Sequence, residues 1–97
     1  MFEIDEEKET VKKLAEQASV IAADESGGFA WQTKCGALIE KCKTAVIAIQ
    51  PRHSALAEEL SILAANLDLL ASSPRSKSHR DCVVTSIELV IKQAATL

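Results

Sequence analysis

Four stretches of the chain carry apolar residues at alternating spacings of three and four, with one step skipped at Lys8 in the first stretch. Residues spaced in this way lie on one stripe of an α-helix, and such a stripe is buried only against other stripes. Pro or Gly stands in each gap between the stretches and interrupts the helical pattern there. The pattern therefore predicts an all-α protein of four helices. The stripes consist of Ile4, Val11, Leu14, Ala18 and Ile21; Trp31, Cys35, Leu38, Cys42, Ala45 and Ile49; Leu56, Leu60, Leu63, Leu67 and Leu70; and Val83, Ile87, Val90, Ala94 and Leu97.

The expected helices span residues 5–23, 29–50, 52–72 and 78–96, each to within a residue or two. Hydrophobic residues make up 47% of the chain and charged residues 26%, as in a globular protein rather than a disordered one. Residues 1–97 are expected to form a single domain. Short connections between long helices make consecutive helices antiparallel, so we expect an antiparallel up-down-up-down four-helix bundle.

Capping residues give the expected helix ends. Asp5 is expected to cap the first helix, and the glycines at 27–28 to end it in left-handed conformations. Pro51 suits the first turn of the third helix. Ser78, three residues before Asp81, forms a variant of the capping box that would start the fourth helix.

Two helices carry residues that the stripe pattern does not explain. Gly36 lies inside the second helix, where it costs about 1 kcal/mol relative to Ala, so we expect a neighbouring backbone to approach closely there. The third helix carries Ile62, Ala64 and Leu69 in addition to its stripe. It is the most apolar of the four, and we expect it to be the most deeply surrounded.

Charge and composition narrow the classes of partner. A formal net charge of −3 gives no reason to expect a nucleic-acid partner. No apolar run approaches the roughly 20 residues that cross a bilayer, and the first residues do not follow the pattern of a signal peptide. The cysteine count, three, is odd and suits a reducing compartment. We expect a soluble, cytoplasmic protein without a membrane span.

The residue pattern offers no catalytic or metal-binding set. Cys35, Cys42 and Cys82 lie in helical segments and are interpreted as small buried hydrophobic residues. His53 and His79 are expected to face solvent, and neither has a second metal ligand at helical spacing. We therefore expect no enzyme activity, no metal and no cofactor.

Apolar residues that the stripes do not use indicate a protein partner. Ile47, Leu89 and Val20 fall on outer sides of the second, fourth and first helices. If Ile47 and Leu89 are adjacent, their patch would suit a homodimer or an amphipathic partner helix. The favoured function is a non-enzymatic interaction module, an adaptor or assembly domain that binds another protein or itself through these residues.

A basic segment before the fourth helix supports an alternative function. Arg75, Lys77 and Arg80 lie close to Ser78, where the free amides and the dipole of a helix N-terminus attract anions. The simpler interpretation is that these charges cap a helix and face the acids of residues 24–25 across the end of the bundle. The alternative function is a regulatory domain that binds an anionic ligand.

Overall fold

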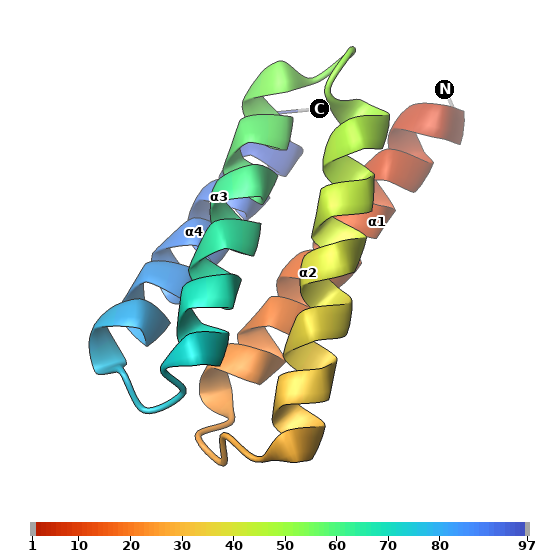
Figure 1. Ribbon diagram of the computed structural model, residues 1–97. Helices are drawn as coiled ribbons and strands as arrows, with labels where there is room; N and C mark the ends of the chain where they lie inside the picture. The colour runs from red at the N-terminus through yellow and green to blue at the C-terminus, as the bar shows by residue number, and fades with distance from the viewer. Residues whose placement is uncertain (1, 97) are drawn as a thin grey trace.

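The computed structural model describes the backbone of residues 2–96 and the side chains of residues 6–96. Its helices are α1 (Phe2–Ala23), α2 (Phe29–Ile49), α3 (Ser54–Ser72) and α4 (Lys77–Ala95). They run alternately in opposite directions around one core and form a bundle of 40 × 21 × 17 Å (Figure 1). The predicted all-α four-helix bundle is confirmed.

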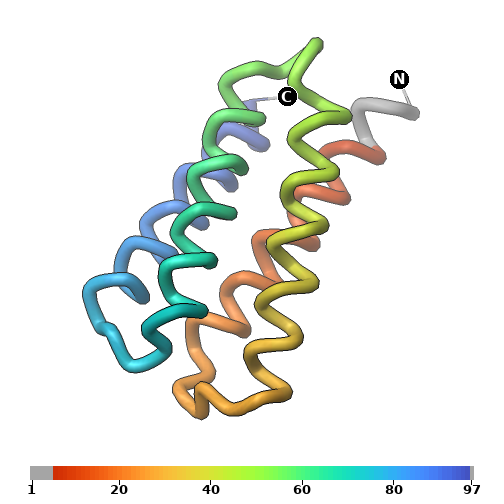
Figure 2. Tube along the Cα trace, in the orientation of Figure 1, coloured from red at the N-terminus to blue at the C-terminus, as the bar shows by residue number. Residues whose placement is uncertain are grey.

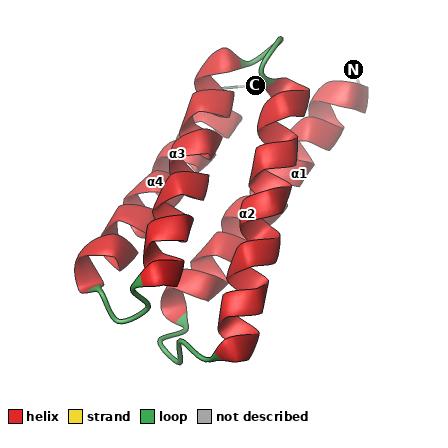
Figure 3. Ribbon diagram, in the orientation of Figure 1, coloured by secondary structure: helices red, strands yellow, loops and turns green. Residues whose placement is uncertain are grey.

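The two ends of the bundle differ in what they bring together. The trace places the α2–α3 turn and the end of α4 at the upper end, beside the first turns of α1 that it draws in colour (Figure 2). The loops of residues 24–28 and 73–76 lie at the lower end (Figure 3). Each helix packs against its two neighbours in the ring, with α2 and α3 in closest contact and α1 and α2 in the loosest. None of the helices within residues 2–96 is apolar over a length that would reach across a membrane.

The core is built from the predicted stripes. The five stripe leucines of α3 are at most 2% exposed, and the stripe residues of the other helices surround them. Burying one leucine side chain stabilises the fold by about 1.5–3 kcal/mol, so α3 is the central contributor. Trp31 is also buried, and its Nε1 donates a hydrogen bond to the carbonyl oxygen of Ile21 at 3.0 Å, which joins α2 to α1. Ile4 and Leu97 lie outside the described side chains.

The starts of α1 and α4 differ from the prediction. α1 begins at Phe2, three residues earlier, because no Pro or Gly interrupts the helix before Asp5, whose side chain lies outside the described ones. At the start of α4, Ser76 Oγ accepts a hydrogen bond from the amide of His79 at 3.2 Å. The predicted cap at Ser78 is wrong because a capping residue needs an extended backbone, and Ser78 is already helical.

Pro51 lies in a turn and not in the first turn of α3. The amides of Arg52 and His53 both donate to the carbonyl oxygen of Ile49, at 3.0 and 2.8 Å. These bonds close the reversal directly after α2. α3 begins only at Ser54, so the prediction that it starts at residue 52 is wrong by two residues.

Among the glycines, Gly27 has the conformation that requires one. Its φ is +62°, and a Cβ atom added there would lie 2.9 Å from Pro74 Cβ. Gly28 is extended, with φ −79°, so of the pair only Gly27 takes the predicted left-handed conformation. Gly27 therefore lets the two lower loops pack against each other.

The expected close approach at Gly36 is wrong. A Cβ atom added at Gly36 would meet no atom within 4 Å, and the residue is exposed. α2 places Gly36 on the side away from its core stripe. No neighbouring backbone therefore needs the space that a missing side chain leaves.

Gly27→Ala is expected to lower the free energy of unfolding by about 1–3 kcal/mol, because alanine is strained at positive φ and its methyl group would collide with Pro74. Urea denaturation followed by circular dichroism measures the change. Gly28→Ala is the matched control and should change stability by less than about 0.5 kcal/mol. Equal losses in the two variants would contradict the packing of the loops.

Gly36→Ala is expected to raise the free energy of unfolding by about 0.5–1 kcal/mol. The exposed position gives the methyl group room, and alanine loses less backbone entropy than glycine in a helix. The same urea titration measures the gain. A destabilised variant would show that another chain segment lies close to Gly36.

Candidate functional site

The three residues predicted to bind a partner are all exposed on outer faces. The exposed fractions are 75% for Ile47, 41% for Leu89 and 68% for Val20. α2 and α4 occupy diagonal corners of the bundle, since each packs between α1 and α3 (Figure 1). Ile47 and Leu89 are therefore not adjacent, and a patch made of these two alone does not form.

Leu89 has different neighbours, which lie on α3. Asn66 Nδ2 donates to Ser86 Oγ at 2.6 Å and fixes the level at which α3 and α4 meet. The two helices are antiparallel, so a residue one turn before Asn66 lies level with the residue one turn after Ser86, and the reverse holds on the other side of the bond. Ile62 is thus level with Leu89, and Leu69 with Cys82. The side chains placed in this way are called the α3–α4 strip and are Ile62, Leu89, Leu69 and Cys82.

The expectation that α3 is the most deeply surrounded helix is wrong for two of its residues. Ile62 and Leu69 are 42% and 49% exposed. The stripe leucines already occupy the side of α3 that faces the core, and seven-residue spacing places Ile62 and Leu69 together on the outer side. Ala64, by contrast, is buried as expected.

A groove between α2 and α3 connects Ile47 with the strip. Ile47 lines one part of this groove and Ile62 another, and both parts share Val46 and Ser61. Ala64 and Ala65 form part of the α3 wall beside Ser61 and Asp68, so the lining between the two isoleucines combines apolar and polar side chains. The continuous surface is called the α3 surface and consists of Val46, Ile47, Ile62, Ala65, Leu69, Cys82 and Leu89.

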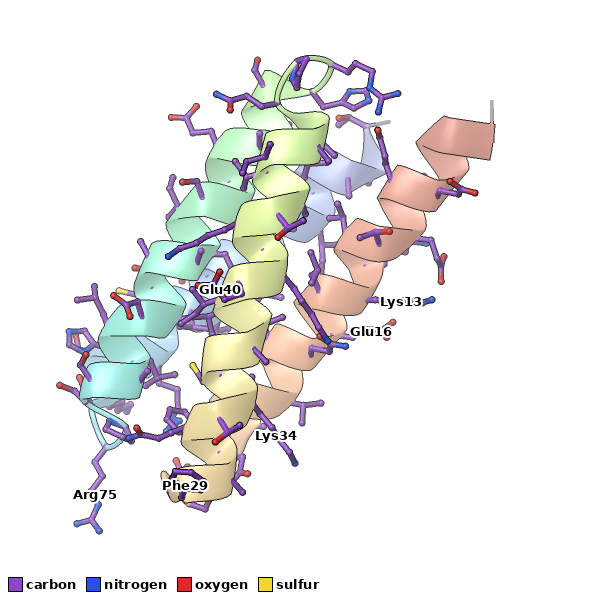
Figure 4. The ribbon with its side chains drawn as sticks, turned by 45° about the vertical axis from the view of Figure 1, so that its right-hand side comes forward. Lys13, Glu16, Phe29, Lys34, Glu40 and Arg75 are labelled. Atoms are coloured by element: carbon purple, nitrogen blue, oxygen red, sulfur yellow. The ribbon has the colours of Figure 1, made fainter. Side chains whose placement is uncertain are left out.

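The basic residues predicted to hold an anion lie at the lower end. Arg80 Nη1 donates to the carbonyl oxygen of Ala22 at 3.0 Å, and its Nη2 donates to that of Pro74 at 2.7 Å. This guanidinium therefore ties the end of α1 to the α3–α4 loop. Arg75, Lys77 and Arg80 line a shallow depression with Glu25, as the antiparallel order predicts, and Arg75 points away from the bundle (Figure 4). Ser78 lies exposed in the first turn of α4.

Local hydrogen bonds at the lower end also stabilise the ionised form of the Asp24 carboxyl. The amide of Ser26 donates to Asp24 Oδ1 at 2.9 Å and, with the Ser26 side chain, lowers the pKa of that carboxyl. The positive charges of Lys34 and Arg80 lower it further. The bases of this end thus have acidic neighbours within the chain.

The histidines are less exposed than predicted. His53 Nε2 lies 3.5 Å from Glu7 Oε2, with the two side chains 23% and 13% exposed. Glu7 also forms an ion pair with Arg52, so the first turns of α1 are held against the α2–α3 turn. His79 is partly buried, and its Nδ1 is shielded from solvent. The expectation that both histidines face solvent is therefore only partly met, because His53 lies against Glu7 of α1 and one ring nitrogen of His79 is shielded.

The cysteines divide into two classes. Cys35 and Cys42 are fully buried, as predicted, whereas Cys82 is exposed on the α3–α4 strip and was wrongly expected to be buried. Burial raises the pKa of the Cys42 thiol to about 11. Burial and the charge of Asp68 also raise the pKa of Cys35. These shifts disfavour the thiolate, which is the reactive form.

At pH 8, Cys82 is expected to be the one thiol that reacts rapidly with Ellman's reagent. A thiol with a pKa of about 11 is only about 0.1% ionised at that pH, and both core thiols are shielded from the reagent. Cys82→Ser should abolish the rapid phase, and unfolding in urea should release the other two thiols. Rapid reaction of Cys35 or Cys42 in the folded protein would contradict the packing of the core.

The described side chains contain no group of three or more His, Cys, Asp or Glu residues that could hold a metal ion. No protein-family model matches this sequence, and no curated protein or solved structure matches it either. Two apolar features of the described surface carry the residues predicted to bind a partner. They are the α3 surface and a groove between α1 and α2 that Val20 lines.

Proposed function

We propose that this chain is a non-enzymatic protein–protein interaction module, an adaptor or assembly domain, and that its α3 surface binds a second protein or a second copy of the chain. The observation that supports the proposal is the continuity of this surface. Ile47, Ile62 and Leu89 come from three different helices, and each is more than 40% exposed. Single exposed apolar residues are ordinary, but a contiguous apolar patch is typical of an interface.

The polar groups of the α3 surface favour docking over catalysis. Asn66, at the centre of the strip, already donates to Ser86 and to the carbonyl oxygen of Cys82, the latter at 3.5 Å. A partner can therefore cover the NH2 group of Asn66 without leaving it unsatisfied. Charged residues stand at the border of the surface, where Lys43 pairs with Glu40 at 3.9 Å. Charged side chains thus border the exposed apolar residues, as at the rim of an interface.

The proposed location is the cytoplasm, because the described cysteines are free thiols and one of them is exposed. The alternative function, a regulatory domain that binds an anion at Arg75, Lys77, Ser78 and Arg80, has less support. The Arg80 guanidinium already serves two carbonyl oxygens, and Glu25 and Asp81 line the same depression. An incoming anion would meet both carboxylates there.

Leu89→Arg and Ile47→Arg are expected to weaken partner binding or self-association at least tenfold, because each places a charge in the apolar centre of the interface. Light scattering after size-exclusion chromatography, over a range of concentrations, measures self-association. Quantitative mass spectrometry of proteins retained by the immobilised chain compares the variants for a different partner.

Val84→Arg is the matched control, because Val84 is 43% exposed, close to the 41% of Leu89. It lies seven residues before Ile91, which lines a depression with α1 residues, so helical spacing puts it on the α1 side of α4. Val84→Arg should leave both measurements unchanged. All variants should keep the helical circular dichroism of the parent. If Leu89→Arg and Val84→Arg behave alike, the α3 surface is not the interface.

A further inference from the structure

The groove between α1 and α2 lies on a different part of the bundle from the α3 surface. Its apolar wall is formed by Val20 and Ile21 on α1 and by Ala37 and Leu38 on α2. α1 and α2 form the most loosely packed neighbouring pair in the ring. Ala37 has a small side chain, and Val20 across the groove is exposed. The groove is therefore an apolar depression between two helices.

The α2 rim of this groove is basic. Lys34 and Lys41 line it and are both exposed. They stand seven residues apart on α2, which separates them by about 10 Å, or two helical turns. Within residues 6–96, neither lysine forms an ion pair with an acid. Lys34 lies near enough to Asp24 for its charge to lower the pKa of that carboxyl, but the two form no salt bridge. Both ammonium groups can therefore meet acidic side chains spaced two turns apart on another helix.

The α1 rim differs in charge. Glu16 and Gln17 line it, and Lys13 and Glu16 project from α1 on the side of the bundle where Lys34 projects from α2 (Figure 4). An acidic side chain placed over the α1 rim would meet the Glu16 carboxylate. The charges therefore favour an occupant that is acidic along its α2 side and not along its α1 side.

We infer that the α1–α2 groove binds an amphipathic helix of a partner protein, with its apolar stripe on Val20 and a row of acidic side chains on Lys34 and Lys41. A groove between two helices accepts the ridge of side chains of a third, and apolar residues at helical spacing anchor it. The charge row sets the orientation and speeds the encounter. This inference goes beyond the proposed function, since it concerns a second surface with a partner of defined chemistry.

Three synthetic helical peptides of about 18 residues test the inference by isothermal titration calorimetry with the full chain. The acidic probe has a leucine stripe flanked on one side by glutamates. The basic probe has lysines in place of the glutamates, and the third probe keeps the glutamates but has serines in place of the leucines. We expect the acidic probe to bind at least tenfold more tightly than either of the others, with an affinity that falls as salt is added.

Variants of the chain locate the binding site. The double variant Lys34→Glu with Lys41→Glu should bind the basic probe in preference to the acidic one, and Val20→Ser should weaken the acidic probe about fivefold. The matched control is Lys12→Glu with Lys43→Glu, which changes the net charge equally but lies outside the α1–α2 groove. It should keep most of the affinity of the parent. Lys34→Gln with Lys41→Gln repeats the test should the charge-reversed variant lose its helical circular dichroism.

Equal binding of the acidic and basic probes would overturn the inference, as would equal losses in the two double variants. No binding of the acidic probe would overturn it as well. Leu89→Arg separates this inference from the proposed function, because it should leave the acidic probe bound. If Leu89→Arg alone abolishes binding, the probe occupies the α3 surface and the α1–α2 groove is not its site.

Discussion

The bundle depends on the burial of one leucine stripe. The stripe residues of α3 touch the inner sides of the other helices and are almost wholly removed from water. This arrangement places one side of α3 in the core, while the outer side contributes the Asn66–Ser86 bond but leaves its large apolar residues exposed. Ile62 and Leu69 lie on that outer side. Their exposure is thus not required by the fold, which is why the α3 surface invites a functional explanation.

Polar contacts at the two ends close the bundle without building a reactive site. At the upper end Glu7 meets Arg52 and His53, and at the lower end Arg80 joins two carbonyl oxygens. Each of these contacts joins two different segments of the chain. His53 and Arg80, two of the residues that the sequence makes conspicuous, are in this way used to close the bundle. The outer faces of the helices are then the free part of the molecule.

The sequence was sufficient for the helices, their order and the core, because apolar spacing reports directly which side of a helix is buried. It was insufficient for the helix starts, where Ser76 and Ser78 both satisfy the same local rule and only the path of the loop decides between them. It also misjudged Ile62 and Leu69, since an apolar residue looks alike whether it faces the core or water. Which outer residues of different helices become neighbours depends on their relative level. That level is set by a tertiary contact, the Asn66–Ser86 bond, which no local pattern contains.

The position of Trp31 has a practical consequence. It is the single tryptophan of the chain, and its indole nitrogen is bonded to the carbonyl oxygen of Ile21 across the seam between α1 and α2. Any opening of this seam breaks that bond and wets the ring, which moves the intrinsic emission of the protein to longer wavelength while the helices themselves stay folded. The fluorescence of Trp31 therefore reports whether α1 is packed against α2.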